Sequence, residues 1–210
     1  MAGWSIIAMT IAMHFSAALP FLFAAGAYAQ VSAEYTDEET GITFQRFSAD
    51  AIGYSFGIAM PSDTSSTDFI GQVTGPSTGW SGVSLAGQML NSLLIVTYDD
   101  ADAIDSGFYM ANTYGSPPEI EGDFSMTPIP SGTSVTADGF KYTFLCSDCI
   151  QSDGTTFQPD MDTVLIGWAY SQVEPVEGIF TKHSMQGQVP FDIASARSED
   201  FEAWSSMVSS

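Results

Sequence analysis

Short apolar runs separated by clusters of Gly, Pro, Ser, Thr and Asp follow one another along most of the chain. Runs rich in β-branched and aromatic residues recur roughly every ten residues, a spacing that is typical of a β-sandwich. The runs cover residues 42–47, 54–60, 68–74, 80–85, 93–98, 107–111, 140–146 and 164–170. The pattern predicts an all-β fold, an antiparallel β-sandwich.

Two of these runs show the period of a half-buried strand. Large side chains alternate with smaller ones at Tyr54, Phe56, Ile58 and Met60, and again in 140–144. Only 193–204 reads as a helix, and it is short. The Pro- and Thr-rich stretch 114–136 predicts a long loop that is functional or wraps an edge of the sandwich. We find no repeat and no second domain.

The first 29 residues carry no Asp, Glu, Lys or Arg and resemble a secretory signal peptide. Residues 5–25 form an apolar stretch that is broken by His14 and Pro20, and Ala27-Tyr28-Ala29 forms a small-x-small cleavage pattern before Gln30. The alternative is an uncleaved membrane anchor, because about 20 apolar residues can span a bilayer. We expect a signal peptide over 1–29, a secreted domain over 30–210, and no membrane association after cleavage.

The charge is strongly one-sided, with 25 acidic and 4 basic side chains and a net charge of -21. Nucleic-acid binding is excluded, because contacts to phosphates need clustered Lys and Arg. Hydrolase chemistry also finds little support. Gly53-Tyr54-Ser55-Phe56-Gly57 fits a GxSxG elbow, but that elbow needs a turn and a helix, whereas the alternation here runs on as a strand. No pair of carboxylates stands out for glycoside cleavage.

The supply of metal ligands is small. Removal of the signal peptide removes His14 and leaves His183 as the only histidine, so blue-copper and zinc sites are improbable. Cys146 and Cys149 have the spacing of covalent haem attachment, but Ile150 follows where histidine is required. The pair suits a local disulfide or a redox-active dithiol, and the latter lacks its strand-to-helix context.

A lone histidine and several methionines remain as candidate ligands. Met89 follows a predicted strand and a glycine-bracketed loop and precedes the run 93–98. Taken alone, a methionine at such a position is usually core filler. His183 taken alone is usually a surface or hydrogen-bonded residue.

Two segments around these residues carry a resemblance to a known family. Residues 80–94 (WSGVSLAGQMLNSLL) are similar to the segment around the haem-binding methionine in the cytochrome domain of fungal cellobiose dehydrogenases. Residues 180–187 (FTKHSMQG) resemble the segment around that family's haem-binding histidine. Further blocks that match in order lie at 35–41, 110–114, 144–149 and 164–171.

The resemblance implies an immunoglobulin-like or DOMON-like sandwich with one non-covalent haem b. Met89 and His183 would be the axial iron ligands, Tyr114 would contact a haem propionate, and Cys146 and Cys149 would form a disulfide. Two protein ligands leave no open position on the iron, which suits single-electron transfer.

The expected function is that of a secreted, stand-alone b-type cytochrome with possible ferric reductase activity. The chain ends too soon after His183 for a flavin dehydrogenase domain. The electron would come from an extracellular dehydrogenase, a small phenol or a quinol. It would pass to a copper polysaccharide monooxygenase or to ferric iron, as in fungal lignocellulose degradation. The alternative is a haem-free carbohydrate-binding sandwich.

Overall fold

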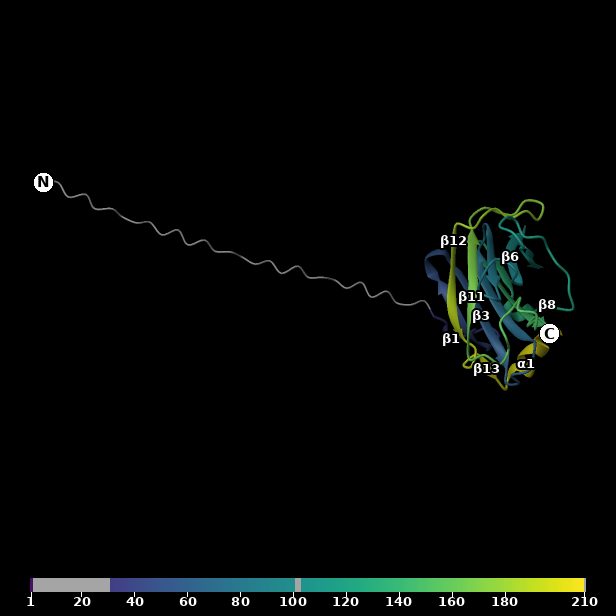
Figure 1. Ribbon diagram of the computed structural model, residues 1–210. Coiled ribbons are helices and arrows are strands. Elements are labelled where there is room, and N and C mark those ends of the chain that lie inside the picture. Colours follow the sequence, from purple (N-terminus) through teal and green to yellow (C-terminus); the bar gives the residue numbers. More distant parts are fainter. Residues whose placement is uncertain (2–30, 101–102, 210) are drawn as a thin grey trace.

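The fold is a sandwich of two mainly antiparallel β-sheets, which confirms the predicted class (Figure 1). The computed structural model describes Met1, residues 31–100 and residues 103–209. Within these residues, the larger sheet has the order β1(Ala33–Thr36), β2(Thr43–Ala49), β3(Tyr54–Pro61), β4(Phe69–Pro76), β10(Gly139–Ser147), β8(Ser125–Pro128), with β13(Arg197–Ser198) on β3 and β9(Ser134–Thr136) on β10. The smaller sheet has the order β12(Met185–Asp192), β11(Thr163–Ser171), β5(Trp80–Ser84), β6(Leu94–Asp100), β7(Ala103–Tyr109).

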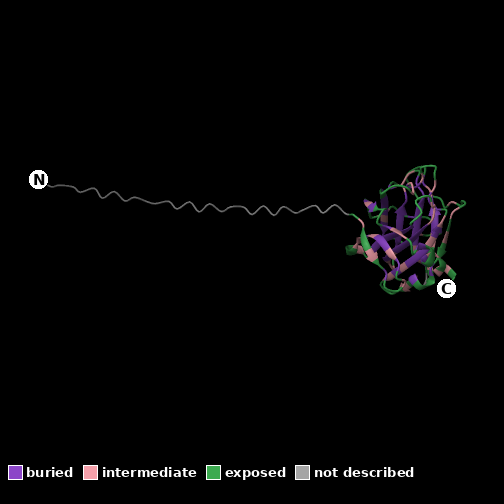
Figure 2. Cartoon of the chain, turned by 90° about the horizontal axis from the view of Figure 1, so that it is seen from below, coloured by how far each residue is buried: buried purple, intermediate pink, exposed green. Residues whose placement is uncertain are grey.

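The main hydrophobic core lies between the two sheets (Figure 2). The alternating residues of β3 and of β10 point into it, as their period of two predicts. They meet side chains of the smaller sheet there: the ring centroids of Phe56 and Phe191, for example, lie 5.7 Å apart. Burial of this face accounts for the strict alternation along both strands.

The C-terminal helix covers the outer face of the larger sheet, but it is shorter than the sequence indicates. The predicted helix over 193–204 is wrong in its first two thirds, because α1(Phe201–Ser205) begins only at Phe201. The preceding residues turn and pair with β3 as β13, where Arg197 donates to the carbonyl of Pro61 at 3.3 Å. Phe201 and Trp204 then pack on Ile42, Phe44 and other residues of a second apolar cluster.

The stretch 114–136 was predicted to be a loop, and this is only partly correct. It contains β8, a 3-10 helix over Pro130–Gly132, and β9. Both strands pair with β10, so the stretch does wrap the edge of the larger sheet. A search for apolar runs misses short, polar strands such as β8 and β9, because their outward side chains are not apolar.

The GxSxG segment does not form a nucleophile elbow. Ser55 lies on β3, which continues without a turn to Pro61, and its side chain is buried. Its hydroxyl shares a hydrogen bond of 2.8 Å with the hydroxyl of Thr74 on the neighbouring strand. Ser55 therefore stabilises the pairing of two strands.

In the part of the chain that the structure describes, no helix is long and apolar enough to cross a membrane. The predicted signal peptide over 1–29 lies almost entirely outside the described residues. It stays a prediction.

A buried ionic network joins the start of the larger sheet to β10. The carboxylate of Asp37 accepts hydrogen bonds from Lys141 Nζ at 2.9 Å and from Gln72 Nε2 at 3.1 Å. Burial raises the pKa of Asp37, but the hydrogen bonds from Lys141, the Thr40 backbone and Gln72, together with the charge of Lys141, outweigh it and hold the pKa below 3.8. The ionised form of Asp37 is therefore favoured by folding.

We expect the Asp37→Asn variant to lose about 1–3 kcal/mol of unfolding free energy near neutral pH. A carboxyl with a depressed folded-state pKa stabilises the fold above its unfolded pKa, and this contribution is lost as the pH falls through the folded pKa. The difference in unfolding free energy between wild type and Asp37→Asn should thus shrink below about pH 4. Urea unfolding across the acidic range measures this difference.

The matched control is Glu39→Gln. Glu39 also pairs with Lys141, at 2.6 Å, but its side chain is 63% exposed, so its loss should cost less than about 1 kcal/mol. If the difference in unfolding free energy between wild type and Asp37→Asn were the same at acidic and neutral pH, the stabilising role of ionised Asp37 would be contradicted.

Candidate functional site

A cleft of about 920 Å³ lies on the outer face of the five-stranded sheet, the face turned away from the main core. Ligand pockets for small molecules and cofactors typically have about 300–1,000 Å³. Met89, Tyr114 and His183 all line this cleft. The structure thus brings together the three cofactor-binding residues that the resemblance implies.

The side of the cleft formed by the sheet carries small, aromatic and aliphatic residues. Gly82 lies between Ala169 and Val96 in the strand register. A Cβ on Gly82 would lie 3.1 Å from the ring of Trp80, so this glycine lets the indole lie over the strand. Trp80, Leu94 and Val96 make this side of the cleft apolar, which suits the macrocycle of a cofactor such as a haem.

The loop that carries Met89 is held against the sheet. Gly87 has a φ of 81°, which favours glycine, and its carbonyl accepts a hydrogen bond of 2.6 Å from Gln188 Nε2. A Cβ on Gly167 would lie 2.7 Å from that carbonyl oxygen, so only glycine lets the loop approach. Met89 itself is half-buried. These contacts fix the loop at one end of the cleft.

The segment that carries His183 is anchored on both of its flanks. Phe180 is buried against Trp80, with ring centroids 5.7 Å apart, and its backbone N–H donates to Ser116 Oγ at 3.0 Å. On the other flank, the backbone N–H of Ser184 donates to the carbonyl of Tyr170 at 2.8 Å. His183 is thereby held half-buried at the cleft.

The electrostatic surroundings of His183 favour its neutral form. Partial burial lowers the pKa of the imidazole below 6.5, and the positive charge of neighbouring Lys182 lowers it further. A neutral imidazole has a nitrogen lone pair, which metal ligation requires. His183 is thus in the protonation state that suits a ligand.

Met89 and His183 reach the cleft at two positions that are offset along β11. Met89 follows the end of β5 where Ser84 pairs with Gly167 of β11. His183 precedes β12, which begins opposite Tyr170 of β11. Three residues of strand separate Gly167 from Tyr170, about 10 Å. A flat group between them would present one side to each residue.

Tyr114 and the cysteines occupy different places. Tyr114 lies at the cleft rim and is 82% exposed. Cys146 and Cys149 form the expected disulfide, with an S–S distance of 2.07 Å, at the end of β10. Both cysteines are buried in the main core. The disulfide thus stabilises the fold without lining the cleft.

Sequence reasoning missed the glycines of the cleft and two polar groups beside them. Gly82 and Gly167 could have been found from the alternation of small residues along their strands. Trp80 and Trp168 line the cleft, and the buried indole N–H of each has no hydrogen-bond partner among the described residues. An unsatisfied buried donor is unfavourable, so a polar atom of a bound group would stabilise it.

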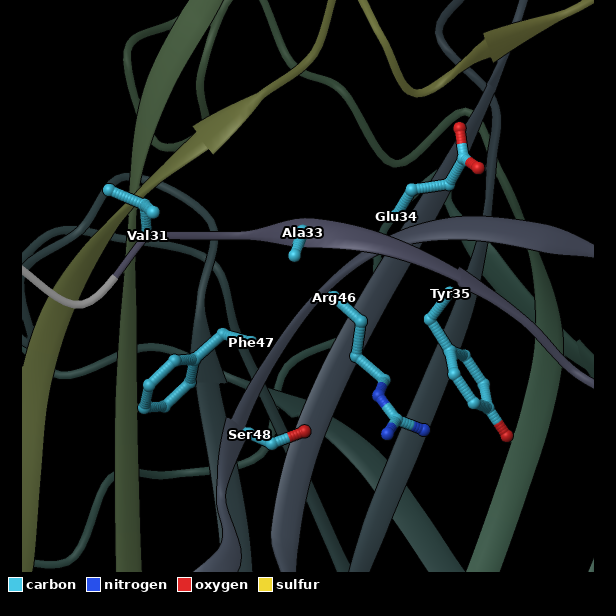
Figure 3. Close-up of a pocket in the computed structure, with 7 residues that line it drawn as sticks. All are labelled: Val31, Ala33, Glu34, Tyr35, Arg46, Phe47 and Ser48. Carbon is cyan, nitrogen blue, oxygen red and sulfur yellow. The ribbon is translucent and has the colours of Figure 1, made fainter.

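A second pocket, of about 360 Å³, lies on strands β1 and β2 of the larger sheet (Figure 3). It is lined by Val31, Ala33, Glu34, Tyr35, Arg46, Phe47 and Ser48. The guanidinium carbon of Arg46 lies 3.4 Å from the ring centroid of Tyr35, a cation–π contact. This pocket shares no residue with the cleft and holds none of the predicted ligands.

Comparison with known proteins extends the likeness over most of the chain. The family model described as the cytochrome domain of cellobiose dehydrogenase matches residues 35–203. A pyrroloquinoline quinone-dependent pyranose dehydrogenase of Coprinopsis cinerea is 31% identical over 177 residues, which are 78% of this chain and 24% of the relative. This chain thus spans about a quarter of that relative's length.

Two solved structures have the same fold. The cytochrome b domain of pyranose dehydrogenase from Coprinopsis cinerea superposes with a TM-score of 0.75 and 25% identity, covering 84% of this chain and 95% of the other. The cytochrome domain of Myriococcum thermophilum cellobiose dehydrogenase superposes with a TM-score of 0.74 and 26% identity, covering 86% of this chain and 98% of the other.

Proposed function

Because this chain belongs to the family of cellobiose dehydrogenase cytochrome domains, we propose that it is a b-type cytochrome that binds one haem non-covalently and transfers single electrons. Met89 and His183 are the axial ligands in this proposal. The observation that carries it is that these two residues, far apart in the sequence, line one cleft at positions offset along β11.

The ligand pair explains why electron transfer is the fitting chemistry. Iron with protein ligands on both axial sides has no position open to oxygen or substrate, so haem bound here would exchange electrons rather than activate a ligand. The anchored loops keep Met89 and His183 in place, which limits the reorganisation that electron transfer requires.

The open rim of the cleft is where partners would approach. Tyr114 is exposed there, and we assign it to a haem propionate. The donor in this proposal is an extracellular dehydrogenase, a small phenol or a quinol, and the acceptor is a copper polysaccharide monooxygenase or ferric iron. Secretion follows from the predicted signal peptide, and mass spectrometry of the exported protein should find an N-terminus at Gln30.

An absorption spectrum tests the proposal directly. The purified protein, expressed with haem supplied, should show sharp low-spin bands after reduction with dithionite. Their absence from a folded, haem-supplemented sample would overturn the cytochrome assignment and would favour a haem-free binding module.

We expect electron exchange to depend on the charge of the acceptor. The net charge is -21, and Glu174 and Glu177 are exposed on the segment that leads to His183. Reduced protein should therefore be reoxidised by hexaammineruthenium(III) more slowly as salt rises, by about tenfold, as the Debye length falls from ~10 Å at 0.1 M to ~3 Å at 1 M. Stopped-flow absorbance measures the rate.

The anionic acceptor hexacyanoferrate(III) is the matched control for this salt dependence. Its rate should rise with salt, because screening removes repulsion. Equal salt dependence for the cationic and the anionic acceptor would show that the acidic surface does not steer partners.

A further inference from the structure

Lys182 differs from the other basic residues of this acidic chain in having no partner. The sequence contains 4 Lys and Arg residues, all within the described part. Lys141 pairs with two carboxylates, Arg197 donates to the carbonyls of Pro61 and Pro159, and Arg46 stacks on Tyr35. No ion pair, hydrogen bond or ring contact to a described residue engages Lys182.

The position of Lys182 places this free charge at the cleft. Lys182 lines the cleft next to His183, and it is exposed. Two hydroxyl groups near it are already engaged: Ser116 Oγ accepts from the backbone N–H of Phe180, and the hydroxyl of Thr181 shares a hydrogen bond of 3.1 Å with that of Ser171. Lys182 is thus the cleft residue that keeps three charged donors available.

The chemistry of this position suits a carboxylate. A haem carries two propionates, and a protein of charge -21 disfavours the binding of two further negative charges. A lysine ammonium offsets such a charge by a charge-assisted hydrogen bond. Resting on the proposed function, we propose that Lys182 binds a haem propionate and, with Tyr114, forms an anion-binding rim of the cleft.

The test separates the propionate from the rest of the haem. Haem-free protein is titrated, by absorbance at low ionic strength, with haem b and with its dimethyl ester, which has the same macrocycle and no carboxylate. Lys182→Gln should weaken haem b binding about three- to tenfold. The lower value is expected for the loss of an exposed ion pair and the upper value for the loss of a partly buried one. It should leave dimethyl ester binding unchanged, and Lys182→Arg should restore most of the haem b affinity.

Arg46→Gln is the matched control, because it removes one positive charge from the second pocket, on the other sheet. It should bind both haems as wild type does. If Lys182→Gln bound haem b as tightly as wild type, or lost affinity for both haems equally, the assignment of Lys182 would be overturned. If wild type gave no low-spin spectrum with either haem, the proposed function would fail, and the role of Lys182 with it.

Discussion

Replacing His183 by alanine is expected to abolish low-spin haem binding. In the described part of the chain His183 is the only histidine, so the described residues offer the cleft no second imidazole. The remaining candidate, Met89, is a single thioether, a weaker ligand than imidazole. The reduced spectrum of the variant should therefore lack the sharp bands that the wild type shows.

Thermal unfolding gives an independent measure of the same loss. A ligand that binds only the folded state stabilises it by about 2.7 kcal/mol at a concentration of 100 Kd. Haem should thus raise the Tm of the wild type and leave that of His183→Ala nearly unchanged. Gln186→Ala, at an exposed residue of the same cleft, is the control and should behave as wild type. A wild-type spectrum in His183→Ala would refute the ligand assignment.

Replacing Met89 by alanine should retain the haem but open one axial position and lower the reduction potential. His183 continues to hold the iron, while loss of the thioether removes the ligand that favours the reduced state. Axial ligands set haem potentials over a range of roughly 0.8 V, and we expect a decrease on the order of 0.1–0.2 V. Added imidazole should bind to the variant and not to the wild type.

Met185→Ala is the matched control for Met89→Ala. Met185 is the methionine nearest to His183 in sequence, but it begins β12 at the His183 end of the cleft and is 42% exposed. Its loss should leave both spectrum and potential unchanged. If the reduction potential changed in Met185→Ala and not in Met89→Ala, Met185 rather than Met89 would be the methionine ligand.

The strands that the sequence predicts are those that carry a run of buried side chains. All eight predicted runs correspond to strands, most with ends within about two residues, the usual uncertainty of strand ends. The run at 107–111 is displaced, because β7 begins at Ala103 with exposed polar residues. The missed strands β1 and β12 lie at sheet edges, where polar residues and Pro190 interrupt the apolar pattern.

The false part of the predicted helix has a different cause. Ile193 and Ala196 are apolar at a helical spacing, but both are buried in the core between the sheets. Asp192 accepts a hydrogen bond of 2.9 Å from the backbone of Ser195, which closes a turn instead of a helix. Tertiary packing thus overrides a local periodicity.

The sequence alone determines the fold class, because strand alternation and turn residues are local properties of the chain. It also supplies the ligand types, through two segments that resemble those of a known family. Only the tertiary structure decides that Met89 and His183 enter one cleft, that Gly167 lets the Gly87 loop approach the sheet, and that Lys182 is left unpaired beside the cleft. These features depend on pairing between strands distant in sequence, which no local pattern specifies.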